Sequence, residues 1–191
     1  MSNSPVDQLE AFRGERASAT DGLARVSPSA VGKLEEKCGP LPRDYVNLLT
    51  TFGAGRLVLT EGEEPVVHTL LAPRDVLKTR KALASWLSAE SVNTARERQQ
   101  LDVARLIPFL SAADGTTWVV LAGQKAADNR VFVFAHDWEQ RADLDVFAGP
   151  HTLAVFFDRY LSLARRGEPL NGSQAHRVLF AAGGKYRAAR R

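Results

Sequence analysis

The sequence predicts a single α+β domain, with a mainly antiparallel sheet of about five to six strands packed with helices. Two observations lead to this class. Helical and strand patterns occur in groups, with two helices first, then strands, a helix, more strands and a closing helix. Only the short segment GQKAADNR joins two apolar strand patterns, whereas a parallel crossover needs about a dozen residues or more. The chain of 191 residues suits one domain with its own core.

Two helices are predicted near the start of the domain. The first begins at Ser27, because a serine side chain can accept from exposed amides and Pro28 fits a first helical turn. In the second, Pro42 again fits the first turn, and Gly53 follows at its end, where glycine adopts a left-handed conformation without steric cost. Its apolar stripe consists of Tyr45, Leu48, Leu49 and Phe52.

The glycine pair Gly53 and Gly55 can be interpreted as a phosphate cradle or as a turn. A dinucleotide fingerprint needs its glycines after a strand and before a helix, so that helix amides face the phosphates. Here the glycines close a helix and precede the pattern RLVLT, and Val58 stands where a third glycine is required. We therefore expect a turn.

The remaining elements follow from apolar periodicity. The runs RLVLT and PVVHTLL predict two strands joined by the charged turn EGEE, and an amphipathic helix is expected from Pro73 to Ser88. A polar segment over 90–102 follows. The runs RLIPFL, TTWVVLA and RVFVFA predict three strands, and HTLAVFFDRYLSLARR predicts the closing helix.

These patterns divide the chain into an N-terminal helical or irregular segment (1–25), the α+β domain (26–166) and a C-terminal extension with a basic tail (167–191). The net charge is +3, but residues 165–191 hold seven basic residues and one acid, so the preceding residues carry −3. The folded body is therefore mildly acidic, and nucleic acid is not expected as a partner. A single cysteine, no secretory signal and no apolar run of membrane-spanning length predict a cytoplasmic protein without membrane association.

The sequence indicates no catalytic centre, metal site or cofactor. Cys38 falls on the apolar face of a predicted helix, where thiols usually pack without reacting. No histidine has ligand spacing to another, and no serine lies in a G-x-S-x-G elbow. We therefore expect a binding protein rather than an enzyme.

Acidic residues form the candidate site. They gather in TEGEEP and in AHDWEQRADLD, the second of which also offers an aromatic anchor. One interpretation is ordinary solvated loop charge, and the other is an acidic docking face for a basic partner. The residues expected to bind a partner are Glu61, Glu63, Glu64, Asp137, Trp138, Glu139, Asp143 and Asp145.

Several ordered segments resemble the SUKH superfamily, which includes the Smi/Knr regulators and many bacterial immunity proteins. VGKLEEKCGPLPRDYVNLL is similar to the family's opening, with matches at Leu41, Pro42, Tyr45 and Leu48. LIPFLSAADGTTWVVL resembles a later segment, through Ile107, Pro108, Phe109, Asp114, Gly115 and Trp118. RVFVFAHDWE and TLAVFFDRYL are similar to the next strand and the closing helix. The chain departs from the family in the glycine turn at residues 53–55 and in the polar segment over 90–102.

The resemblance implies a binding scaffold without catalytic residues. It predicts an immunity protein that neutralises a cognate secreted toxin, such as a nuclease or a deaminase, by occluding it. The alternative is an intracellular scaffold or regulatory module of the Smi/Knr type with no toxin partner. The oligomeric state and the identity of the toxin stay open.

Overall fold

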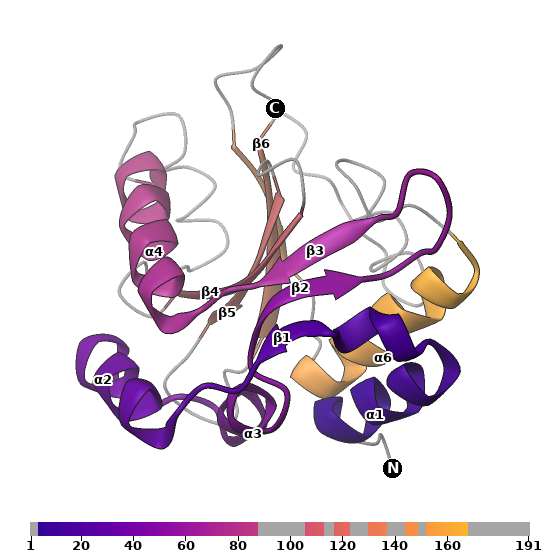
Figure 1. Cartoon of the computed structure of the whole chain (residues 1–191). Coiled ribbons are helices and arrows are strands. Elements are labelled where there is room, and N and C mark those ends of the chain that lie inside the picture. Colours follow the sequence, from indigo (N-terminus) through magenta and orange to yellow (C-terminus); the bar gives the residue numbers. More distant parts are fainter. Residues whose placement is uncertain are drawn as a thin grey trace.

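The computed structural model describes residues 4–87, 106–112, 117–122, 130–136, 144–148 and 152–167. These residues form five α-helices, one short 3₁₀ helix and seven strands (Figure 1). The helices are α1 (Pro5–Glu15), η1 (Ala17–Thr20), α2 (Pro28–Cys38), α3 (Arg43–Thr51), α4 (Pro73–Leu87) and α6 (Leu153–Arg165). The strands are β1 (Gly22–Ala24), β2 (Ala54–Val58), β3 (Val67–Leu70), β4 (Leu106–Ala112), β5 (Thr117–Ala122), β6 (Arg130–His136) and β7 (Leu144–Ala148).

The strands form one antiparallel sheet in the order β1 to β7, so each strand pairs with its neighbours in sequence. The predicted α+β class and antiparallel sheet are confirmed. The predicted number of about five to six strands is not confirmed, because the described residues alone form a sheet of seven. The sequence patterns missed β1, which has only three residues and no apolar alternation, and β7, which lies where an acidic loop was expected.

The start of α2 follows the predicted chemistry, whereas Pro42, predicted in the first turn of α3, is the N-cap residue before it. In α2, the amide of Ala30 donates to the Ser27 hydroxyl at 3.3 Å, and Pro28 opens the helix. In α6, the amide of Val155 donates in the same way to the Thr152 hydroxyl at 3.3 Å. The helix α4 begins at Pro73 as expected and ends at Leu87, close to the predicted boundary.

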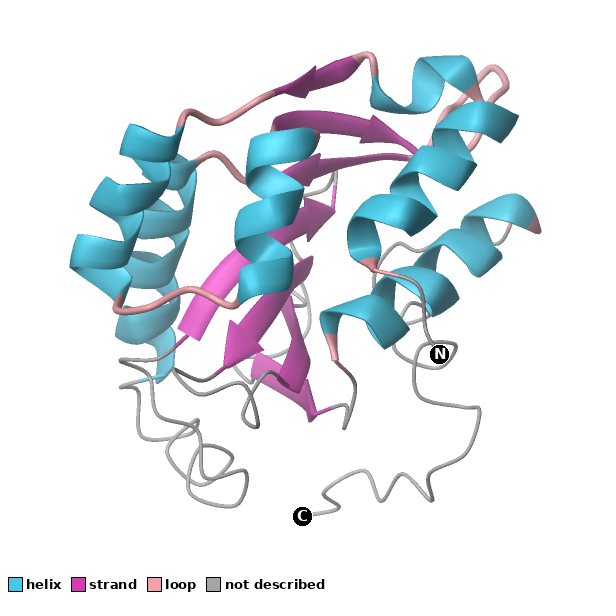
Figure 2. Ribbon diagram, turned by 90° about the horizontal axis from the view of Figure 1, so that it is seen from below, coloured by secondary structure: helices cyan, strands magenta, loops and turns pink. Residues whose placement is uncertain are grey.

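One hydrophobic core joins all five α-helices to the sheet. Its centre is aromatic, because Phe109 of β4 lies 5.7 Å from Phe156 and 6.3 Å from Phe157, measured between ring centroids. The N-terminal segment adds Leu9 and Phe12 of α1, which are fully buried. Figure 2, viewed from below, shows the helices grouped in front of the strands.

The glycine pair after α3 is required by the conformation and close packing of the backbone. Gly53 has a φ of +101° and Gly55 a φ of +134°, both in the range that favours glycine. A Cβ atom added to Gly53 would lie 1.8 Å from the carbonyl oxygen of Ala24, and one added to Gly55 would lie 2.1 Å from that of Gly22. The two glycines therefore let β1 approach the end of α3 and the start of β2.

Candidate partner-binding site

The turn between β2 and β3 carries three of the predicted site residues. It is closed by two hydrogen bonds of 2.8 Å, from the Leu59 amide to the Val66 carbonyl and from the Val66 amide to the Thr60 hydroxyl. Gly62 has a φ of +133°, which lets the chain reverse at the tip. We call residues 60–66 the acidic turn.

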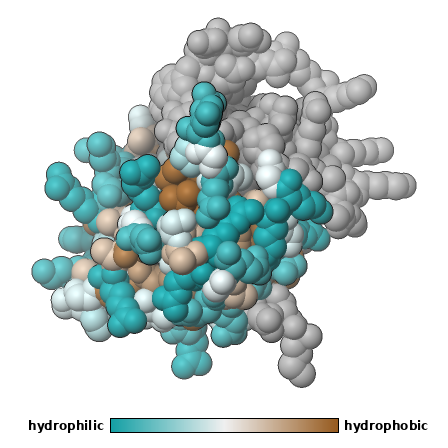
Figure 3. Space-filling model, turned by 45° about the vertical axis from the view of Figure 1, so that its right-hand side comes forward, coloured by the Kyte–Doolittle hydropathy of each residue, from teal (hydrophilic) through white to brown (hydrophobic). Residues whose placement is uncertain are grey.

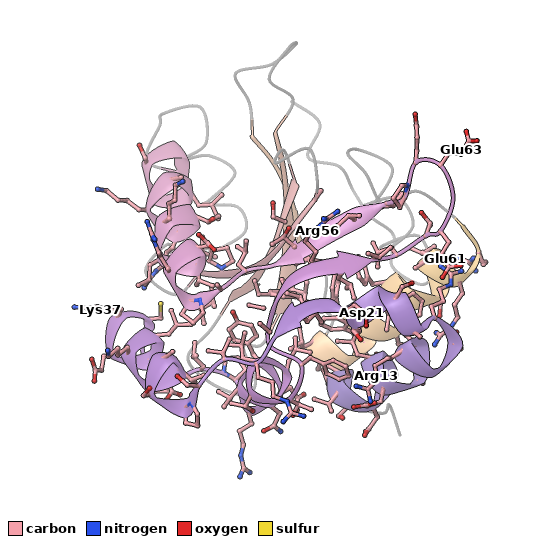
Figure 4. The ribbon with its side chains drawn as sticks, in the orientation of Figure 1. Arg13, Asp21, Lys37, Arg56, Glu61 and Glu63 are labelled. Carbon is pink, nitrogen blue, oxygen red and sulfur yellow. The ribbon has the colours of Figure 1, made fainter. Side chains whose placement is uncertain are left out.

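Glu61, Glu63 and Glu64 are all exposed on the acidic turn. Figure 4 shows Glu63 pointing outward from the tip, with Glu61 lower on the same turn. Among the described residues, neither Glu63 nor Glu64 forms an ion pair, so their charge is not neutralised locally. Figure 3 shows that the coloured residues on this side of the molecule are mostly hydrophilic, with small hydrophobic areas between them.

The N-terminal segment holds the base of the acidic turn. The guanidinium of Arg16 donates to the carbonyl oxygen of Leu59, the residue after β2, and lies 5.5 Å from the ring centroid of Phe12. The Ser18 hydroxyl donates to a carboxylate oxygen of Glu61 at 3.4 Å. These contacts restrict the motion of the turn, which reduces the entropy that a partner must overcome on binding.

Sequence reasoning missed these supporting residues. Arg16 and Ser18 each lie 43 positions from the residue that they contact, and no local pattern reports such a pairing. Asp21 was also missed, although it is exposed and lies on the same side of the molecule as Glu61 in Figure 4. A single acid in the stretch TDGLA does not form a cluster along the chain.

The second acidic group is only partly described. Asp137, Trp138, Glu139 and Asp143 lie outside the described residues. Asp145 was expected in a loop, but its backbone belongs to β7 and pairs with Ala135 of β6, because the alternating pattern LDVFA suits an edge strand. Three strands separate β7 from β3, so four spacings of about 4.8 Å place the backbone of Asp145 roughly 19 Å from β3, measured across the strands.

His68 and Cys38 are polar side chains of the core, and each contacts another side chain of the protein. His68 of β3 is buried, and its Nδ1 atom lies 2.7 Å from the hydroxyl of Tyr160 in α6, within hydrogen-bond distance. Cys38 is buried, and its sulfur accepts from the guanidinium of Arg80 at 3.1 Å. Within the described ranges, no group of three histidine, cysteine or acidic residues could hold a metal ion.

Because the hydroxyls of Tyr45 and Tyr160 are buried, we expect the protein to lose stability at alkaline pH. Burial raises the pKa of both hydroxyls above the ordinary value of 10.0. Above about pH 10 the unfolded chain therefore binds fewer protons than the folded one, and the free energy of unfolding falls as pH rises. Tyr45→Phe and Tyr160→Phe should each reduce this fall, measured by urea unfolding between pH 8 and about pH 11.

At neutral pH the same two variants should differ. The Tyr45 hydroxyl is buried and has no hydrogen-bond partner among the described residues, so Tyr45→Phe should leave stability unchanged or slightly increased. Tyr160→Phe removes the hydroxyl that bonds to His68, which should cost about 1–3 kcal/mol. Equal effects at pH 7 would contradict this assignment.

Comparisons with known proteins add no family. No protein-family profile matches the chain, and no curated protein matches it significantly. No helix among the described residues has the length and apolar character needed to span a membrane.

Proposed function

We propose that this protein is an immunity protein of the SUKH type, which binds a cognate secreted toxin and neutralises it by occlusion. The exposed acidic turn is the observation that carries the proposal. It presents three carboxylates on a hairpin that Arg16 and Ser18 brace from outside the sheet. The ordered resemblance of the sequence segments to the SUKH superfamily supports the same function.

The charge of the turn determines the kind of partner. Carboxylates that carry no local ion pair attract a basic surface, speed the encounter and disfavour acidic competitors. Nuclease toxins act on phosphates and often present basic surfaces, so a nuclease suits this turn well. In this mechanism the immunity protein covers the toxin's site and carries out no chemistry of its own, and we expect it to act in the cytoplasm.

Co-expression tests the function directly. The protein should restore growth to cells that express the toxin encoded beside it, and the purified proteins should form a stable complex. If growth is not restored but the protein captures a host protein through the same turn, the regulatory module of the Smi/Knr type becomes the better proposal. Turnover of a small substrate by purified protein would contradict both.

Charge reversal tests the acidic turn. Glu63→Lys/Glu64→Lys should weaken toxin binding about 100-fold in calorimetry, because two attractions become repulsions. The matched control is Glu36→Lys/Asp158→Lys, which makes the same change in net charge at two exposed sites on α2 and α6. An equal loss in both variants would indicate a response to net charge and would remove the turn from the interface.

A further inference from the structure

The exposed side of α4 carries a group of cations that the acidic turn does not explain. Arg74, Lys78 and Lys81 are exposed and lie at positions i, i+4 and i+7, which form one stripe along a helix. We call these three residues the basic stripe. At about 1.5 Å per residue they span roughly 10 Å along the helix axis.

The charges of the basic stripe are available to a ligand. Among the described residues, none of its three side chains forms an ion pair or a hydrogen bond. The helix carries one acid, Asp75, next to Arg74 in the first turn. The end of α2 adds Lys37 nearby, because Arg80 of α4 donates to the Lys37 carbonyl at 2.9 Å.

The basic stripe and the acidic turn lie on different sides of the molecule. In Figure 1, α4 lies on the opposite side of the molecule from the turn between β2 and β3, and Figure 4 shows Lys37 on the α4 side and Glu63 on the far side. The net charge of the folded body is mildly acidic, but α4 still presents a basic surface. The distribution of charge, and not its sum, decides which ligands can approach.

We propose that the basic stripe binds the phosphate backbone of a nucleic acid without reading its sequence. Lysine and arginine side chains bind phosphates by charge alone and gain affinity by releasing counterions. Insertion into a lipid surface would need large apolar side chains beside the cations, whereas the other exposed residues described over 74–85 are Asp75, Ala82 and Ser85. Docking of an acidic protein would need an aromatic or aliphatic anchor, and the exposed side chains described over residues 74–85 include no aromatic or large aliphatic one.

The test measures binding of the full chain to a fluorescently labelled 20-base-pair DNA duplex at several salt concentrations. Each phosphate contact contributes about −0.9 to the slope of log K against log salt. The variant Lys78→Gln/Lys81→Gln should therefore show a slope that is shallower by about 1.8 and a weaker affinity at 100 mM salt. The parent protein and its variants all keep the basic tail, so the difference between their slopes measures the contribution of the basic stripe.

The matched control is Arg43→Gln/Arg56→Gln, which removes the same charge from exposed residues of α3 and β2. It should keep the parental slope, and Glu63→Lys/Glu64→Lys should not reduce duplex binding. Equal slopes for the stripe variant and the parent protein, or an equal change in the control, would overturn the proposal. So would binding to anionic phosphatidylserine vesicles that depends on the stripe while duplex binding does not.

Discussion

Replacing Gly53 with alanine is expected to destabilise the fold by more than about 3 kcal/mol. Two physical effects add. The φ of +101° strains any residue with a Cβ atom, at a cost of about 1–3 kcal/mol. The new Cβ would also lie 1.8 Å from the Ala24 carbonyl oxygen, a backbone atom that can move only if β1 separates from β2. Urea unfolding followed by circular dichroism measures the loss.

Gly62→Ala separates the two effects. Gly62 also has a left-handed φ, of +133°, but no atom lies within 4 Å of an added Cβ. This control should lose only the strain, about 1–3 kcal/mol. If both variants lose the same stability, the close approach of β1 is not what requires glycine at position 53.

Phe157→Ala is expected to cost about 3–5 kcal/mol, because it opens a cavity in the centre of the core. The ring of Phe157 is fully buried and lies 5.5 Å from Phe156 and 6.1 Å from Tyr160, between centroids. Its loss removes one ring contact from each of three aromatic neighbours, Phe109, Phe156 and Tyr160. Urea unfolding should show a lower midpoint with an unchanged slope if the native state remains compact.

The adjacent exposed residue provides the control for Phe157. Asp158→Ala removes a side chain of the same helix that faces solvent, so it should change stability by no more than about 0.5 kcal/mol. A loss below about 1 kcal/mol for Phe157→Ala would mean that the α6 face is not packed against the sheet as described.

The helices α2, α3, α4 and α6 were predictable because their signals are local. Ser27 and Pro28 mark the start of α2, the apolar stripe of Tyr45 and its neighbours marks α3, and all of these residues lie within a few turns of each other. The antiparallel pairing of β5 with β6 was predictable for a similar reason, because a short connection excludes a crossover.

The missed strands depend on contacts between distant residues. Gly22, Leu23 and Ala24 carry no strand pattern and become β1 because the backbone at Gly55 leaves room for pairing. The β7 strand was hidden by acids that suggested a loop, although the backbone of Asp145 continues the sheet beside Ala135.

In the candidate site too, some residues could be predicted from the sequence and others could not. Glu61, Glu63 and Glu64 were predicted from three acids in one short turn, and the structure places all three at the surface. Arg16 and Ser18 could not be predicted, since the hydrogen bonds that brace the turn join residues 43 positions apart.

The sequence by itself determined the α+β class, the antiparallel connections and the position of the acidic turn, because each depends on the spacing of residues within one element or one loop. Only the tertiary structure decided that β1 and β7 extend the sheet, that η1 braces the acidic turn and that the cations of α4 lie away from it. Packing and long-range hydrogen bonds settle those features, since they depend on which distant segments the folded chain brings into contact.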